Sequence, residues 1–181
     1  MINSGYDGCC YVRMMLPAFH NGFSMDRSSR RSERKPINDI KHELFDADVV
    51  VFHRPEHKSY HTLVNMLKKD GKKIVIDNDD TFKLDDYHPL AQFGAEGEHQ
   101  ESLKARNDSM DGALKIADLV TCSTEFLAEE YRKINDNVVV LPNCVDQYDW
   151  DEPLRNEGKK TRIGIVGSAA IEYDYLHVKD D

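Results

Sequence analysis

Ala117-Asp-Leu-Val-Thr-Cys-Ser-Thr124 opens the stretch that decides the fold, and Asn137-Val-Val-Val-Leu-Pro-Asn-Cys-Val-Asp146 closes it. Leu119–Cys122 and Val138–Leu141 are apolar runs of a length typical of buried strands and too short for helices. Between them, three apolar side chains recur at helical spacing: Leu127, Tyr131 and Ile134. A strand, a helix and a second strand in this order predict a parallel βαβ unit with a right-handed crossover.

The same alternation of strand and helix runs through the rest of the chain. Val49–Phe52 and Lys73–Ile76 are predicted strands, and Met1–Asn3 looks like the stub of an earlier one. The residues between the two longer strands have helical periodicity, and Gly71 is placed to end that helix. The sequence therefore predicts an α/β fold, a Rossmann-like parallel sheet with helices on both faces.

Composition excludes several classes of partner. The chain has 181 residues, of which 24 are basic and 33 acidic, so its formal net charge is −9. Such a protein is a poor general nucleic-acid binder, because neutralisation of phosphates dominates that affinity. No apolar run approaches the roughly 20 residues of a membrane span, and the start of the chain lacks the features of a signal peptide. The four cysteines form no CxxC pair, which favours reduced thiols in a cytoplasmic protein.

Polar residues follow two of the predicted strands directly. His53-Arg54 comes after Val49–Phe52, and Asp77-Asn78-Asp79-Asp80 comes after Lys73–Ile76. Because the carboxyl ends of parallel strands meet at one edge of the sheet, we expect these residues to converge there. Arg54 is the expected counter-charge for these acids, since a guanidinium can bind a carboxylate with two hydrogen bonds. The alternative is that the acids cap a helix or lie in solvent.

Two glycines, Gly5 and Gly8, lie in a loop between the stub strand and a helix predicted over Cys9–Phe19. Glycines allow backbone N–H groups to approach a phosphate closely. A plain turn from strand to helix explains the same residues equally well.

The motifs, taken together, resemble those of a known family. Ala117–Thr121 with Ser123-Thr124, followed by Val140–Asn143 with Val145-Asp146, is similar to the "AD-hhh-x-S" and "hhPN-x-hD" segments (h, apolar) of group 1-type glycosyltransferases with the B-type fold. Gly8–Arg13 resembles the glycine loop and first helix of one branch of that family.

The resemblance implies a division of the chain into three parts. Residues 1–148 would be a Rossmann-like acceptor-side domain, 149–161 an interdomain linker, and 162–181 the start of a truncated donor-binding domain. Arg162–Gly167 resembles the first strand of that second domain. The family holds the nucleotide-sugar mainly in the second domain, with an E-x7-E pair that has no counterpart here. We therefore expect this chain to transfer a sugar to an unknown acceptor only with the missing carboxy-terminal domain, and to be inactive alone.

The resemblance also implies which residues form the site. The expected catalytic residues are Asp77, Asp79 and His53. The expected substrate-binding residues are Gly5, Gly8, Arg13, Arg54, Asp80 and Asn143. B-type enzymes usually need no metal, because a helix dipole and basic side chains stabilise the leaving diphosphate. We thus expect no metal and no cofactor, the nucleotide-sugar being the donor substrate.

Two other functions fit parts of the sequence. Ile74–Phe82 matches the hhhDxDxT start of haloacid dehalogenase-like phosphatases, with Asp77 as nucleophile, Asp79 as acid/base and Mg²⁺ as charge neutraliser. That motif normally opens its domain, whereas here two strands precede it. The other alternative is a non-catalytic α/β domain that binds a sugar or a partner.

Overall fold

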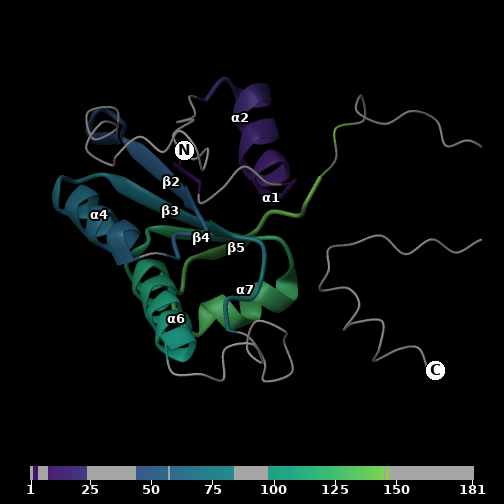
Figure 1. The fold of residues 1–181 in the computed structure, drawn as a ribbon. Helices are drawn as coiled ribbons and strands as arrows, with labels where there is room; N and C mark the ends of the chain where they lie inside the picture. The colour runs from purple at the N-terminus through teal and green to yellow at the C-terminus, as the bar shows by residue number, and fades with distance from the viewer. Residues whose placement is uncertain are drawn as a thin grey trace, which may run out of the picture.

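A parallel sheet forms the centre of the protein in the computed structural model, which describes residues 2–3, 8–23, 44–56, 58–83, 98–144 and 146. Its strands are β1 (Ile2–Asn3), β2 (Val49–His53), β3 (Lys73–Asn78), β4 (Leu119–Cys122) and β5 (Val138–Val140). They lie side by side in sequence order, all parallel (Figure 1). The predicted α/β, Rossmann-like fold is confirmed. Gly5, the predicted linker 149–161 and residues 162–181, with the strand predicted over Arg162–Gly167, lie outside the described residues.

Helices lie on both sides of this sheet. They are α1 (Gly8–Cys10), the π-helical η1 (Tyr11–Met15), α2 (Leu16–Asn21), α4 (Lys58–Lys69), α6 (Glu98–Ile116) and α7 (Glu125–Arg132). Figure 1 shows α4, α6 and α7 on one side and the continuous segment α1–η1–α2 on the other. The three crossovers from β2 to β5 all step in the same direction, so right-handed connections place their helices on the same face.

The helix ends follow the signals in the sequence. The Thr124 side chain caps α7 by accepting a hydrogen bond from the Leu127 amide at 3.3 Å. Gly71, with φ of +80°, follows α4 in the left-handed conformation that glycine adopts at low cost. The end of α4 at Gly71 was predicted from the sequence, and that prediction is confirmed.

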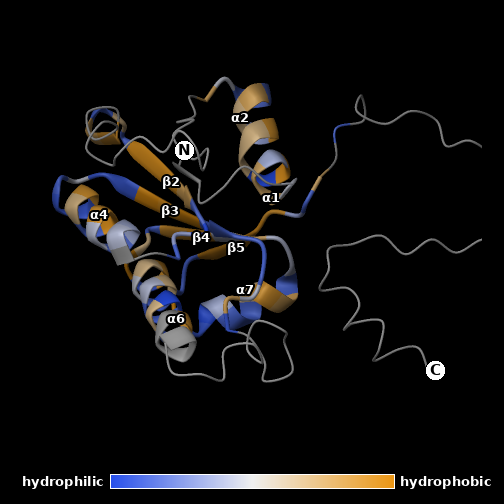
Figure 2. Ribbon diagram, viewed as in Figure 1, coloured by the Kyte–Doolittle hydropathy of each residue, from blue (hydrophilic) through white to orange (hydrophobic). Residues whose placement is uncertain are grey.

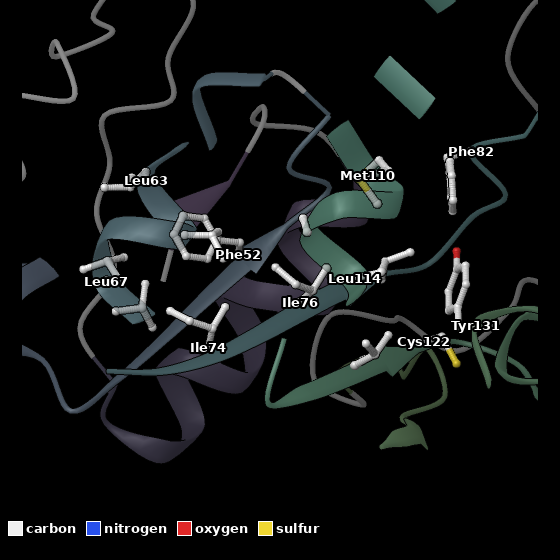
Figure 3. Close-up of a cluster of buried hydrophobic side chains, with 14 of the residues drawn as sticks. Phe52, Leu63, Leu67, Ile74, Ile76, Phe82, Met110, Leu114, Cys122 and Tyr131 are labelled. Carbon is white, nitrogen blue, oxygen red and sulfur yellow. The ribbon is translucent and has the colours of Figure 1, made fainter. Parts of the chain in front are cut away.

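The hydrophobic core lies between the sheet and the helices α4, α6 and α7. Alternate residues of the central strands point into it, and the apolar stretches of β2 and β3 stand out in Figure 2. Figure 3 shows the side chains that fill this layer, with strand residues facing those of the helices. Among the most buried are Phe52, Leu63, Leu67, Ile74, Ile76, Met110, Leu114 and Tyr131.

The opposite face of the sheet is covered unevenly. Val49 and Val139 are exposed, whereas His53, Asp77 and Thr121, nearer the carboxyl ends of their strands, are buried. The segment α1–η1–α2 covers this carboxyl end, since Arg13 of η1 reaches Asp77. A set of polar side chains is therefore enclosed between the sheet and the first helical segment.

Asp118, the acid of the "AD" motif, has a structural position at the amino edge of the sheet. Its carboxylate accepts a hydrogen bond from the Ile74 amide at 2.8 Å and forms an ion pair with Lys68 at 2.9 Å. It thereby connects the start of β4 to the start of β3. This edge is opposite to the one where the candidate site lies.

Gly112, in the middle of α6, permits the close packing of α6 on α4. A Cβ atom built there would lie 2.9 Å from Nε2 of His61 on α4, closer than such contacts normally come. An alanine in a helix interior is otherwise favoured over glycine by about 1 kcal/mol. We expect Gly112→Ala to be more favourable in a His61→Ala background than in the native protein, by roughly 0.5 kcal/mol or more. Urea unfolding of the four proteins in this cycle measures the coupling, and equal effects in both backgrounds would contradict the predicted contact.

Candidate functional site at the carboxyl edge of the sheet

Three polar side chains form a row across the carboxyl ends of the central strands. His53 of β2 pairs in register with Asp77 of β3, and Asp77 pairs with Thr121 of β4. The strands β2 and β3 run further than the sequence indicated, to His53 and Asn78, so His53 and Asp77 belong to the sheet and not to loops. Because side chains alternate between faces, all three point to the face covered by η1.

The Asp77 carboxylate is surrounded by donors. Arg13 binds it with two donors, Nε to Oδ2 at 3.1 Å and Nη2 to Oδ1, and the two side chains are only 3% and 4% exposed. His53 Nδ1 lies 2.9 Å from Oδ2, and Thr121 Oγ1 donates to Oδ1 at 2.5 Å. Burial by itself would raise the pKa of Asp77, but the hydrogen bonds from His53, Arg13 and Thr121 and the charge of Arg13 outweigh it, so the pKa is lowered.

This environment favours a structural role for Asp77. Arg54 is a counter-charge for the acidic cluster, as predicted, but its partners are Asp79 and Asp80. The partner of Asp77 is Arg13. A carboxylate with both oxygens hydrogen-bonded and almost no exposed surface is poorly placed to attack a phosphate. The geometry therefore argues against Asp77 as the nucleophile of a phosphatase.

Arg54 lies at the rim of the same cluster and binds the next acid. Its Nε donates to Asp79 Oδ1 at 2.7 Å, its Nη2 lies 3.7 Å from Asp80 Oδ2, and Nη2 also lies 3.6 Å from Cys9 Sγ. Among the described residues, Arg54 is the one non-glycine residue with a positive φ, at +47°. Such backbone strain costs of order 1–3 kcal/mol and is concentrated at functional sites.

The backbone of the acidic loop is held by side chains from three elements. Asn78 Nδ2 and the Tyr131 hydroxyl both donate to the Asp80 carbonyl, at 2.8 Å and 2.7 Å. Ser123 Oγ donates to the Asp79 carbonyl at 2.9 Å. Burial raises the pKa of the Tyr131 hydroxyl well above its usual range, so the hydroxyl remains a donor. The loop is thus positioned by the core-facing side of the sheet, where α7 packs.

Exposure separates the candidate residues into two groups. His53, Asp77 and Asp79 are enclosed, with side chains 1%, 4% and 5% exposed. Burial by itself would raise the pKa of Asp79, but hydrogen bonds from Cys9 and Arg54 and nearby positive charge outweigh it and lower the pKa. The side chain of Asp80 is 68% exposed, and Gly8 and Asn143 are also exposed. Arg54 lies between the two groups, so the residues that can touch a ligand here are Gly8, Arg54, Asp80 and Asn143.

The first helical segment is bound to the loop after β5. Arg13 Nη1 donates to the Leu141 carbonyl and lies 3.4 Å from Asn143 Oδ1, and His20 Nε2 lies 3.0 Å from Asp146 Oδ2. The Pro-Asn-x-x-Asp segment thereby contacts the helix that follows the glycine loop. Sequence reasoning missed His20 and the pairing of Thr121 with Asp77. That pairing could have been found from the position of Thr121 in β4, two strand residues beyond Leu119 and in line with Asp77.

Several features of the described residues bear on other kinds of site. No disulfide joins the four cysteines. Within the described ranges, no group of three or more His, Cys, Asp and Glu side chains is arranged to hold a metal ion. In the part of the chain that the structure describes, no helix has the length and apolar character needed to cross a bilayer. No known protein-family model and no curated protein matches the chain.

Proposed function

We propose that this chain is the acceptor-side part of a glycosyltransferase of the B type. The observation that supports the proposal most is the binding of the first helical segment to the loop after β5, through Arg13 and His20. The segments that resemble the family, distant in the sequence, thereby meet at the carboxyl edge of a parallel sheet, where ligands of such sheets bind. The absence of a disulfide agrees with a cytoplasmic location.

In this proposal the exposed and the enclosed residues have different roles. Arg54, Asp80 and Asn143 contact hydroxyl groups of the acceptor, and Gly8 lies near the donor phosphates. The rim formed by these exposed residues is held in position by three enclosed side chains, those of Asp77, His53 and Asp79. A fixed rim matters because orienting a hydroxyl toward the reacting carbon contributes much of the acceleration in such reactions.

The reaction divides between two domains. The bond between the anomeric carbon and the diphosphate oxygen breaks, and a bond to the acceptor oxygen forms. The proton of the acceptor hydroxyl leaves with the nucleoside diphosphate. The donor domain stabilises the leaving diphosphate, and this chain orients the acceptor. The isolated chain should therefore bind an acceptor saccharide without turning over a nucleotide-sugar.

The test compares residues 1–181 alone with the same chain supplied with a donor domain, encoded beyond residue 181 or on a second polypeptide. Each sample receives a panel of nucleotide-sugars and candidate acceptor saccharides, and released nucleotide is measured. We expect release only when both parts are present. Transfer by residues 1–181 alone would contradict the division of roles. Hydrolysis of a generic phosphate ester in the presence of Mg²⁺, without any sugar transfer, would favour the phosphatase.

A further inference from the structure

His53 has one ring nitrogen whose role is not accounted for. Nδ1 contacts Asp77 Oδ2 at 2.9 Å, but Nε2 is buried and has no hydrogen-bond partner among the described residues. The nearest carboxylate oxygen recorded for Nε2 is Asp79 Oδ1, at 3.8 Å. Leaving a buried polar atom without a partner destabilises the folded state, so this nitrogen calls for an explanation.

The charges around the ring point to one. Arg13 from η1 and Arg54 after β2 bring two positive charges, while Asp77, Asp79 and Asp80 bring three negative charges. Among the described residues, two more groups contact the cluster: the Thr121 hydroxyl from β4, which binds Asp77, and the Cys9 Sγ from α1, which lies beside Arg54. These two arginines and three aspartates sum to −1 with a neutral imidazole and to zero with an imidazolium.

We propose that His53 carries a proton on both ring nitrogens in the folded protein and bridges Asp77 and Asp79. Nδ1–H donates to Asp77, and Nε2–H points to Asp79 Oδ1. Closing that separation by roughly 1 Å completes a charge-assisted hydrogen bond. With a proton on each nitrogen, the ring points a donor at a carboxylate on either side.

The bridge makes His53 a positioning residue. It joins two ion pairs into one series of alternating charges, Arg13, Asp77, His53, Asp79 and Arg54, which runs from the first helical segment to the acidic loop. The positions of Arg54 and Asp80 then depend on the packing of η1 against the sheet, although η1 is distant from both in the sequence. This inference concerns the protonation of one side chain and does not depend on the proposed glycosyl transfer.

The test is ¹⁵N NMR of histidine side chains in residues 1–181 at pH 7, on the native protein and on two variants. Asp79→Asn removes the charge facing Nε2 and preserves the shape of the side chain. Asp136→Asn makes the same change in an exposed turn before β5, at the other edge of the sheet, and serves as the matched control. His53 is assigned through its own side-chain resonances, so no substitution of the histidine is needed.

We expect both ring nitrogens of His53 to carry protons in the native protein and in Asp136→Asn. In Asp79→Asn we expect the proton on Nε2 to be lost at pH 7 while the proton on Nδ1 remains. A native ring with a single proton would overturn the proposal, whichever nitrogen carries it. A doubly protonated ring that Asp79→Asn leaves unchanged would overturn the bridge to Asp79.

Discussion

Replacement of Arg13 by methionine is expected to lower the free energy of unfolding by about 3–5 kcal/mol, the range found when one partner of a buried ion pair is removed. The substitution keeps most of the side-chain volume and removes the cation that binds Asp77. The carboxylate would then remain buried with only His53 and Thr121 as donors. Urea unfolding at pH 7, followed by circular dichroism, measures the loss.

Two further variants separate the buried pair from a general effect of charge. Arg132→Met removes an exposed cation, which is paired with Glu125 on the surface of α7, and should leave the unfolding midpoint close to that of the native protein. Combining Arg13→Met with Asp77→Asn removes both buried charges and should recover part of the loss. Equal destabilisation by Arg13→Met and Arg132→Met would show that the buried Arg13–Asp77 pair contributes no more to the free energy of unfolding than an exposed pair.

The pH dependence of the same effect follows from the lowered pKa of Asp77. A carboxylate whose pKa is depressed in the folded state contributes stability above its unfolded pKa of about 3.9. That contribution is lost as the pH falls through the folded-state pKa. The difference in stability between the native protein and Arg13→Met should therefore be largest near neutral pH and shrink below about pH 4.

Replacement of Asp80 by asparagine is expected to lower kcat/KM for sugar transfer about 10- to 100-fold, with the donor domain supplied. A hydrogen bond to a charged group contributes about 1.5–3 kcal/mol, and each 1.36 kcal/mol is tenfold in rate. Stability should change little, since the Asp80 side chain is largely exposed. The Oδ1 atom that accepts a hydrogen bond from the Thr81 amide is retained in asparagine. Transfer assays and urea unfolding on the same preparations give the two quantities.

Asp136→Asn is the matched control for this substitution, because it makes the same chemical change in an exposed turn far along the chain. It should leave both kcat/KM and stability unchanged. Asp79→Asn provides a second comparison. If Asp79 simply faced a cleft, as the sequence suggests, Asp79→Asn would lower activity and leave stability nearly constant. Because Asp79 is enclosed and paired with Arg54, we expect Asp79→Asn to lower stability as well. Full activity of Asp80→Asn would place the acceptor elsewhere.

The bounds of the strands were predicted from the sequence only in part. Leu119–Cys122 was predicted with its observed bounds, and the starts of β2 and β3 were also predicted correctly. The ends of β2 and β3 were placed too early, because polarity was taken as the end of the strand. His53, Asp77 and Asn78 continue the sheet because η1 and α7 supply polar partners that strand periodicity does not reveal.

The sequence by itself determined the parallel α/β architecture, the end of α4 at Gly71 and the convergence of the polar strand ends at one edge. These follow from local periodicity and from the geometry that all parallel strands share. Only the tertiary structure decided which charges pair. Arg13 lies 64 residues from Asp77 and meets it because η1 packs on the face of β3 that Asp77 occupies. Arg54 is directed to Asp79 by a left-handed backbone. Which arginine pairs with which aspartate depends on the distances between elements in the folded protein. The spacing of residues within one segment of the sequence does not contain that information.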